Sequence, residues 1–490
     1  MSNVLAPDRE PLDPTPSSLR RARPAASGWF RAVWRWHFFA SFLVVPVLLL
    51  LATTGLIYLF RFQLEPLLHP DLMRVDTSAG GGIAQPYATQ LAVVEQAHPG
   101  STAVSLAEPR APGDPTVVSI TTADGAGREV YVDPYRLEVL GSLDPDRTLS
   151  GYAIRLHGEL MAGRWGDHVI ELGACWAVVM ALTGYYLFVR GWRARLRARR
   201  AGRRGARLRH RHGLVGAVVG VGLLTLLVTG LPWTGFWGER VQTFATERGS
   251  SLWSTDPGAQ SDPASSLDES LPHSHRADVP WAQGDSPVPQ STPPTGDERN
   301  VANVDTAIEV ADQEGLRHPM TVALPAPDDP TGVFSAIGYA FDAPSDERTV
   351  HVGRYGGEVV STYGFDDYPL LAQVVSQGIG LHEGRSLGRW SFWGAALMCL
   401  GVIFMCLTGP LMWWRRRPRG AGRLGAPRGR MPLRASPLMA VGLVGLGVLL
   451  PLFGLSLLAV LLLDQLVLRR VPALAGWFDT VRVTPGGPLR

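Results

Sequence analysis

The chain of 490 residues is poor in cysteine and in charge. Its three cysteines, Cys175, Cys399 and Cys406, all lie in apolar stretches and form no CxxC. They cannot build a disulfide framework in water-exposed parts of the chain, and we interpret them as packing residues. Charged residues make up 18% of the chain and the mean hydropathy is +0.07. This combination predicts apolar blocks separated by polar ones.

Several sequence signatures are also missing. No small-residue cleavage site follows the first apolar block, which is longer than the core of a signal peptide, so we expect an uncleaved anchor. No convincing flavin or nicotinamide site is present, and the glycines after His212 follow no strand, so they are not a dinucleotide fingerprint. They fit close helix packing or the approach of a flat cofactor. Glu171 and Asp464 lie near the ends of apolar blocks, which argues against a transporter with a mid-membrane carboxylate.

The chain does contain five apolar blocks of about 20 residues or more, each long enough to cross a bilayer as a helix. They are Phe38–Phe60, Val169–Val189, Leu214–Trp237, Phe392–Trp414 and Leu438–Leu463. The sequence therefore predicts a mainly α integral membrane protein with about five transmembrane helices in a lipid bilayer.

Arginine is concentrated in Arg20–Arg35, Arg190–His212 and Trp413–Arg430. Because each stretch adjoins an apolar block, we interpret it as a topological signal and not as a nucleic-acid site. The positive-inside rule then predicts a multi-pass protein of the cytoplasmic (inner) membrane with its N-terminus inside.

These patterns predict boundaries for every segment. They are a basic cytoplasmic N-terminus at 1–36; transmembrane segments at 37–61, 168–190, 212–237, 388–414 and 438–463; extracytoplasmic modules at 62–167 and 301–387; a disordered extracytoplasmic linker at 238–300; basic cytoplasmic loops at 191–211 and 415–437; and an extracytoplasmic tail at 464–490.

The two extracytoplasmic modules are predicted to share one small α+β design. Each has a helical pattern, then alternating strand-like runs, then a hairpin centred on Tyr135 or Tyr355. The expected helices are 87–97 and 303–314, and the expected strands include 116–121, 129–132, 321–324, 333–339 and 349–352. The linker is rich in Pro, Ser, Asp and Gly, and its His273 and His275 are weak metal candidates there.

Four of the twelve histidines recur at matched spacings. His37 and His212 each precede the glycine of a Thr-Gly pair by 18 residues, and His157 and His382 precede one by 27 residues. The chain is thus predicted to hold two parallel span–module–span repeats and a C-terminal helix. One matched histidine pair would lie at each membrane face.

Paired imidazoles on facing helices suit the two axial positions of haem b. The residues alone also leave open another metal or no cofactor. His37, His212, His157 and His382 are the expected haem-iron ligands, for one or two haems, and His168 is an alternative to His157. Among the flanking residues, Arg164 and Arg389 are candidates for haem propionates, and Trp165, Trp390, Trp233 and Trp237 for an interfacial belt or a substrate cleft.

The stretches LHGEL…GRWGDHVIELGACWAVVMALTGYYLF and LHEGRSLGRW…LTGPLMWWRRRPRGAGRLGAP, with the Tyr-centred hairpins and the tail LLAVLLLDQLVLRRVP, resemble the PepSY-associated transmembrane family. The resemblance covers most of residues 30–475, except 249–300. It implies an inner-membrane protein with PepSY modules outside, and some members are haem-containing ferric-siderophore reductases. The family's span-flanking histidines fall on His37, His157, His212 and His382. This chain departs from the family in YYLFVRGWR, in its long linker and in its diverged modules.

Two functions follow as hypotheses. The first is a transmembrane haem-b oxidoreductase that takes electrons from a quinol or a redox partner protein and passes them outward, with a ferric chelate as the expected acceptor. The alternative is a non-redox PepSY membrane protein that binds or regulates an extracytoplasmic partner.

Overall fold

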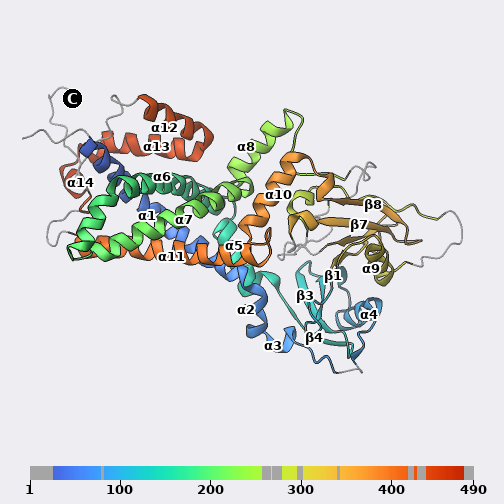
Figure 1. Cartoon of the computed structure of the whole chain (residues 1–490). Coiled ribbons are helices and arrows are strands. Elements are labelled where there is room, and N and C mark those ends of the chain that lie inside the picture. The colour runs from blue at the N-terminus through green and yellow to red at the C-terminus, as the bar shows by residue number, and fades with distance from the viewer. Residues whose placement is uncertain are drawn as a thin grey trace, which may run out of the picture.

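Long apolar helices build one end of the molecule, and a β-sheet builds the other (Figure 1). The structure is a computed structural model that describes residues 26–78, 82–256, 266, 279–294, 302–338, 343–417, 424–426 and 437–478. Among these residues, five helices are long and apolar enough to cross a membrane: Gly28–Leu59, Arg164–Arg200, Ala206–Trp233, Arg389–Arg416 and Pro451–Leu468. The chain is therefore a multi-pass membrane protein.

Four of these helices make the core of the bundle. They are α1 (Ala26–Leu59), α6 (Arg164–Arg200), α7 (Ala206–Gly230) and α11 (Arg389–Arg416). The last turns of α6 and α11 carry arginines, and α7 starts in the same basic stretch. We call this the arginine end of the bundle and the opposite end, next to the sheet, the sheet end.

The fifth predicted span, 438–463, is not one helix. It is divided into α12 (Pro437–Leu449) and α13 (Pro451–Leu463), because Pro451 lacks the N–H that would continue α12. The two helices fold back on each other at two glycines, where a Cβ on Gly454 would come within 2.6 Å of the Gly447 carbonyl oxygen. Figure 1 shows them side by side on the bundle.

The C-terminal part of the chain consequently returns to the arginine end. After a π-helical turn (Asp464–Leu468) and α14 (Pro472–Trp477), the Phe478 carbonyl accepts a hydrogen bond from Arg35 Nη2 at 2.9 Å. The Phe478 ring also packs on Phe39 of α1. The described part of the predicted extracytoplasmic tail, 464–490, thus lies at the same end as the start of α1, which differs from the prediction of opposite faces.

The two predicted modules share one eight-stranded antiparallel sheet with the order β4-β3-β2-β1-β5-β6-β7-β8. The strands are β1 (Thr102–Ala107), β2 (Thr116–Thr121), β3 (Gly127–Asp133), β4 (Glu138–Leu143), β5 (Thr321–Ala323), β6 (Val333–Ile337), β7 (Arg348–Gly353) and β8 (Val359–Gly364). Each half of the chain supplies a four-stranded meander, and β1 joins β5 at the centre, with Leu106 opposite Val322. Both Tyr-centred hairpins, β3–β4 and β7–β8, are present as predicted.

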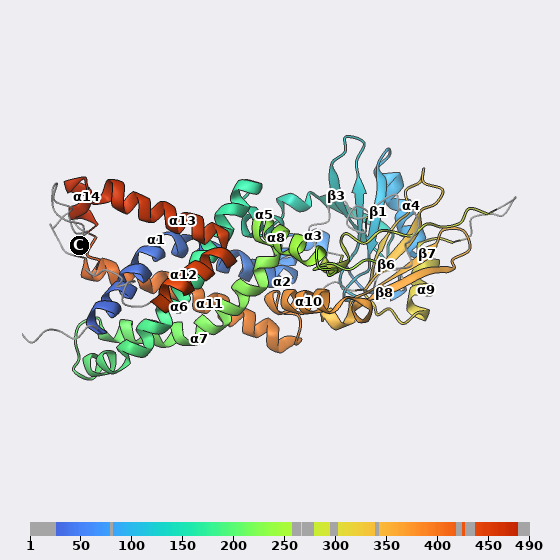
Figure 2. The ribbon, with the colours of Figure 1, turned by 90° about the horizontal axis from the view of Figure 1, so that it is seen from above.

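Helices α4 (Tyr87–Ala97) and α9 (Val304–Gln313) cover one face of the sheet, as Figure 2 shows from above. They bury alternate apolar residues of the central strands, among them Leu106, Val118, Val322 and Ala336. The other face is turned toward the bundle. Helices α5 (Leu149–Glu159) and α10 (Leu370–His382) lead from this face back into the bundle. Both α4 and α9 match the predicted helices closely.

Short elements fill the junction between sheet and bundle. They are α2 (Arg61–Leu68), α3 (Pro70–Met73), α8 (Gly235–Thr246) and the 3-10 turns Pro145–Arg147, Leu231–Trp233, Trp281–Gln283, Pro344–Asp346 and Phe365–Asp367. The range 238–300, for which we expected a disordered linker, differs in its described part. It contains most of α8, and Ser254, Ala282 and Gln283 are buried. His273 and His275 lie outside the described residues.

Candidate functional site

The four matched histidines lie on four different helices, two at each end of the bundle. His37 is on α1 and His212 is on α7, both near the arginine end. His157 is in the last turn of α5, and His382 is the last residue of α10, both at the sheet end. These positions agree with the prediction of one pair at each end.

Each histidine has its Nδ1 atom against a threonine of a neighbouring long helix. The Nδ1···Oγ1 distances are 3.1 Å for His37 and Thr183, 2.9 Å for His157 and Thr54, 2.8 Å for His212 and Thr408, and 3.2 Å for His382 and Thr229. These are the four threonines of the Thr-Gly pairs that define the spacing. The same histidine–threonine contact between neighbouring helices therefore occurs four times in the bundle.

The threonine hydroxyls decide the tautomer of the histidines. Each hydroxyl donates to the carbonyl four residues earlier in its own helix, as Thr54 does to Leu50 at 2.9 Å. With its proton used in this way, the oxygen accepts from the histidine, so Nδ1 carries the proton. Within the described part of the chain, Nε2 of these histidines has no hydrogen-bond partner. A fixed Nδ1–H and a bare Nε2 are the usual state of a metal-binding imidazole.

The glycine after each threonine makes room for the imidazole ring. A Cβ on Gly230 would lie 3.1 Å from His382 Cε1, and one on Gly184 would lie 3.3 Å from His37 Cε1. The equivalent distances are 3.5 Å for Gly55 and His157 and 3.9 Å for Gly409 and His212. The structure thus places a histidine ring against the glycine of each Thr-Gly pair.

The pair at the sheet end has a ring spacing that suits two imidazoles sharing one metal. The ring centroids of His157 and His382 are 6.4 Å apart and the ring planes are perpendicular. Two imidazoles on opposite sides of one metal ion place their centroids about 6 Å apart, because each metal–nitrogen bond is about 2 Å. Within the described residues, no group of three or more His, Cys, Asp or Glu is arranged to hold a metal. This ligand set therefore suits a metal whose other positions are filled by a macrocycle.

A cavity of about 620 Å³ surrounds His157 and His382. This volume falls within the usual range for cofactor sites, about 300–1,000 Å³. Its wall is mainly apolar and comes from α1, α5, α7, α10 and α11. The lining includes Leu51, Gly55, Leu226, Trp233, Ile379 and Cys399. The residues present thus fit a flat, largely apolar group held between the two histidines.

Burial keeps the histidines of this pair neutral. Burial, together with the neighbouring His382, lowers the pKa of His157 to about 4. Burial also lowers the pKa of His382. Since only neutral imidazole binds metal, both side chains are ready ligands at neutral pH.

At the arginine end, His37 Nδ1 also lies 3.1 Å from the Met180 carbonyl oxygen. His37 and His212 are close enough to interact electrostatically. Because 17 residues of α1 separate His37 from Thr54, the two pairs are about 25 Å apart along the helix axis.

His168, the alternative to His157, does not face His382. Its ring packs against Trp165 and Phe236, and its Nδ1 lies 3.9 Å from Asp167. The structure therefore brings His157, and not His168, into the cavity.

The flanking arginines and tryptophans have different surroundings from one another. Arg164 is exposed and lies 3.6 Å from Glu239, Arg389 is exposed, and neither is among the residues that line the cavity. Trp165 and Trp390 are 81% and 86% exposed, which suits an interfacial belt. Trp233 instead lines the cavity, with its ring centroid 5.7 Å from that of His382.

Three cavity residues were missed by the sequence analysis. Trp253 and Trp281 stack on each other with centroids 5.1 Å apart and line the cavity from the supposed linker. Arg385 lines it from the loop after α10 and pairs with Glu347 at 3.0 Å and Glu383 at 2.7 Å. For Trp253 and Trp281, the one sequence signal was the presence of aromatic residues within a Pro- and Ser-rich tract.

A family model described as the PepSY-associated TM region matches residues 34–416 of the chain. This range begins three residues before His37 and ends after Thr408, so it contains all four histidine–threonine contacts. No curated protein matches the chain.

Proposed function

Since the chain belongs to the family of the PepSY-associated TM region, we propose that it is a transmembrane haem-b oxidoreductase of the cytoplasmic membrane. Electrons enter at the arginine end, in the cytoplasm, and leave at the sheet end, outside. The acceptor is a ferric chelate, whose reduction to Fe(II) weakens a hard oxygen chelate and releases iron. The donor is a quinol or a redox partner protein.

The observation that carries this proposal is the tautomer that the threonines impose. Four half-buried imidazoles, each with Nδ1 against a threonine of a neighbouring helix, leave Nε2 for a ligand. The 6.4 Å separation of His157 and His382, inside a cavity of about 620 Å³, supports haem as that ligand.

The four histidines would form two haem sites, one at each end of the bundle. His157 and His382 would hold one haem, and His37 and His212 a second. A haem with two imidazole ligands supplies a low-spin centre that carries one electron. Thr54, Thr183, Thr229 and Thr408 orient the ligands, and the apolar wall around His157 and His382 excludes water.

The proposal includes a duplication of the chain. The span, sheet module and span of residues 37–190 would be repeated in parallel by residues 212–414, with an axis along the membrane normal. In the sheet, β1 to β4 run outward from the centre in one direction and β5 to β8 run outward in the other, in the same order. This arrangement supports the proposed duplication. So does the equal spacing of the histidines and threonines.

The absorption spectrum of the purified full-length protein tests the proposal. We expect a Soret band, sharp α and β bands after reduction, and about two haems per chain. His382→Ala should lower this ratio to about one. His168→Ala is the matched control and should keep it unchanged. A colourless preparation from haem-replete cells would overturn the proposal and favour the non-redox alternative.

A further inference from the structure

The folded part of the predicted linker forms one wall of the cavity that holds His157 and His382. We call residues 252–256 and 279–291 the strap. Asp285 of the strap is exposed to solvent and also lines the cavity, so this wall is part of the molecular surface. Five strap residues line the cavity: Trp253, Val279, Trp281, Gly284 and Asp285.

The strap lies against β7 and β8 without becoming a strand of the sheet. In the described part of the chain, the sheet ends at β8. Gln283 of the strap uses its side chain instead: its Oε1 accepts a hydrogen bond from the Thr349 hydroxyl at 2.7 Å, and its Nε2 donates to the Tyr363 carbonyl at 3.2 Å. Ser254 is hydrogen-bonded to the Tyr363 hydroxyl. Side-chain hydrogen bonds therefore fasten the strap to the sheet.

Few apolar side chains support these hydrogen bonds. Val279 and Val288 pack on Ala323 and Ile337, and Ala282 joins a second small cluster. The main core of the sheet, under α4 and α9, contains no residue of the described strap. Segments with few buried apolar contacts open locally at low cost, and polar interfaces are typical of parts that move relative to each other.

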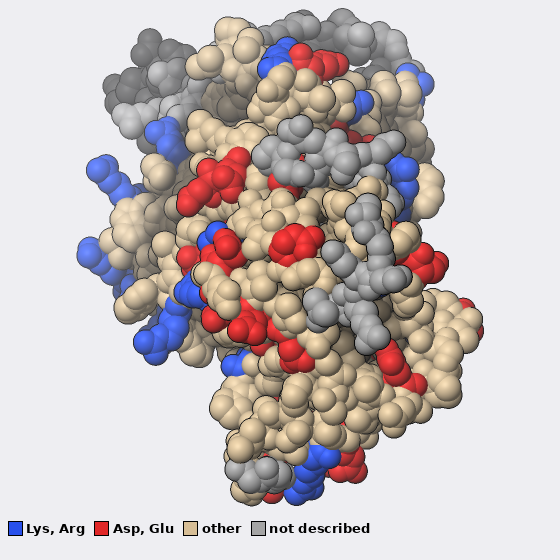
Figure 3. All heavy atoms as spheres, turned by 90° about the vertical axis from the view of Figure 1, so that its right-hand side faces the viewer, with Lys and Arg blue, Asp and Glu red and all other residues tan. Residues whose placement is uncertain are grey.

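Charge gives the strap no net attraction to the module beneath it. The strap contains Asp256 and Asp285 and no Lys or Arg. Residues 302–388, on which it lies, contain 13 carboxylates and 4 arginines. Viewed from the sheet end, Asp and Glu side chains gather on the middle of this face (Figure 3). Because like charges repel, hydrogen bonds and packing hold the strap in place.

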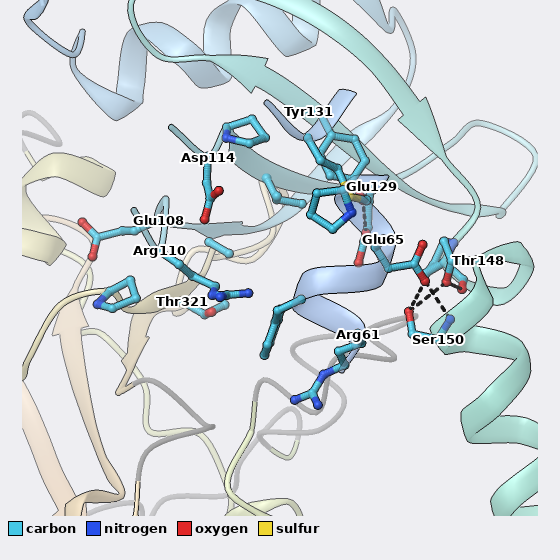
Figure 4. A pocket seen from close by; sticks show the side chains of 18 of the residues that line it. Arg61, Glu65, Glu108, Arg110, Asp114, Glu129, Tyr131, Thr148, Ser150 and Thr321 are labelled. Carbon is cyan, nitrogen blue, oxygen red and sulfur yellow. Dashed lines mark hydrogen bonds between the residues drawn. The ribbon is translucent and has the colours of Figure 1, made fainter. Parts of the chain in front are cut away.

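The first half of the sheet shows the same face without a strap. Glu129 on β3 has the position that Thr349 has on β7, since each lies two residues before the irregularity of its hairpin. In front of Glu129 is a pocket of about 110 Å³, between α2, strands β1–β3 and the start of α5 (Figure 4). A four-stranded meander of this design therefore folds without a segment of chain across this face.

We propose that the strap is a movable gate between the cavity and the solvent on the sheet side. In the closed state seen here, Trp253 and Trp281 cover the cavity with their rings stacked 5.1 Å apart. The gate opens when Gln283 releases β7 and β8, and water-soluble molecules then reach the two histidines. This gate does not depend on which cofactor the histidines hold.

Cys399 is a natural reporter of gate opening, because it lines the same cavity. Cys175 and Cys406 are buried and are not among the residues that line it. The full-length protein in nanodiscs, with any bound haem removed, is treated with a permanently charged methanethiosulfonate. Mass spectrometry then gives the rate at which Cys399 is modified. We expect Gln283→Ala to raise this rate at least about tenfold, because both hydrogen bonds of Gln283 to β7 and β8 are lost.

Two controls and a milder variant accompany this measurement. Gln313→Ala, at an exposed glutamine of α9, should react like the wild type, and Cys399→Ala should abolish the signal. Tyr363→Phe removes only the hydroxyl that is bonded to Ser254 and should also raise the rate.

Hydrogen exchange on the same samples separates gate opening from unfolding. In Gln283→Ala, the amides of Ser254 and Ser286, which bond within the strap, should exchange faster, and those of β2 should not. Modification of Cys399 at the wild-type rate in both Gln283→Ala and Tyr363→Phe would overturn the inference. A preparation that never contains haem would overturn the proposed function and not the gate, since this test needs no haem.

Discussion

At the scale of residues, threonine is the partner that gives each histidine its chemistry. The four histidines can be picked out of the sequence because their spacings to the Thr-Gly pairs are equal. Their contacts with the threonines could not be predicted, because a hydrogen bond between helices depends on how the helices pack. His157 and His168 remained alternatives in the sequence, because only their surroundings in the structure distinguish them.

Replacing Thr54 with Val should weaken the proposed haem site of His157 and His382. The methyl group keeps the volume of the side chain but removes the acceptor for His157 Nδ1–H at 2.9 Å. Loss of such a partner typically costs about 10–100-fold in metal affinity. Haem titration followed by absorption measures this. Thr53→Val, at an exposed neighbour that bonds only within α1, is the control and should bind haem normally.

The low pKa of His157 predicts a pH-dependent stability of the haem-free protein. Its pKa of about 4 in the folded chain lies below the usual 6.5, so the unfolded chain binds more protons between these values. Stability should therefore fall as the pH is lowered from 6.5 to 4, by about 3 kcal/mol in total for this one group. Thermal unfolding in detergent across this range measures it.

A matched pair of variants isolates this effect. His157→Gln should reduce the pH dependence by the share of this one group, because the glutamine does not titrate, while His382 and His351, whose pKa values are also lowered, keep the rest. His98→Gln, in the turn after α4, should leave it as in the wild type. The same slope in His157→Gln as in the wild type would contradict the assignment.

At the scale of elements, the periodicity of apolar residues predicted those helices and strands that the local sequence determines. The α4 and α9 helices and the strands of both hairpins were predicted because each has its own apolar pattern. The folded part of the linker was not predicted, because its sequence has no apolar periodicity of its own. It is ordered by contacts with β7 and β8, such as those of Gln283, and by packing of Val279 and Val288 on Ala323 and Ile337.

Helix α8 depends on a carboxyl group from another helix. Glu171 Oε2 on α6 accepts from the backbone N–H groups of Phe236 and Trp237, both at 3.2 Å, in the first turn of α8. Glu171→Ala should leave both donors unsatisfied and destabilise α8 by about 1–3 kcal/mol. Hydrogen exchange of these two amides should become faster by about tenfold or more.

Two further variants complete this test. Glu171→Gln keeps an acceptor oxygen and should restore much of the protection. Glu239→Gln removes an exposed carboxylate of α8 whose contact with Arg164 contributes little. Slow exchange in Glu171→Ala, equal to that of the wild type, would show that α8 does not depend on this contact.

At the scale of the whole molecule, the C-terminal hairpin sets the topology. Hydropathy marked 438–463 as one apolar block but could not show that the chain turns back at Pro451, which leaves Pro451–Leu468 as the helix long enough to span. We expect the start of α1 and the end of α14 to face the same side of the membrane. Gly28, Gly476 and Gly113 each have open space where a Cβ would be added, so each tolerates a cysteine.

Labelling with a membrane-impermeant thiol reagent tests this topology in sealed vesicles. Gly28→Cys and Gly476→Cys should react from one side, and Gly113→Cys, beside the sheet, from the other. The native cysteines, two buried and one half-buried, provide the background. Reaction of Gly28→Cys and Gly476→Cys from opposite sides would contradict the arrangement.

The seam between β1 and β5 also bears on how such a chain could arise. A chain of half this length would end its sheet at β1 and expose the backbone groups that pair with β5 here. Because Leu106 and Val322 hold matching positions in the two halves, two such chains could close each other's edge by the same antiparallel pairing. A half-length ancestor would then be a homodimer, with each histidine pair supplied by two copies of a single residue.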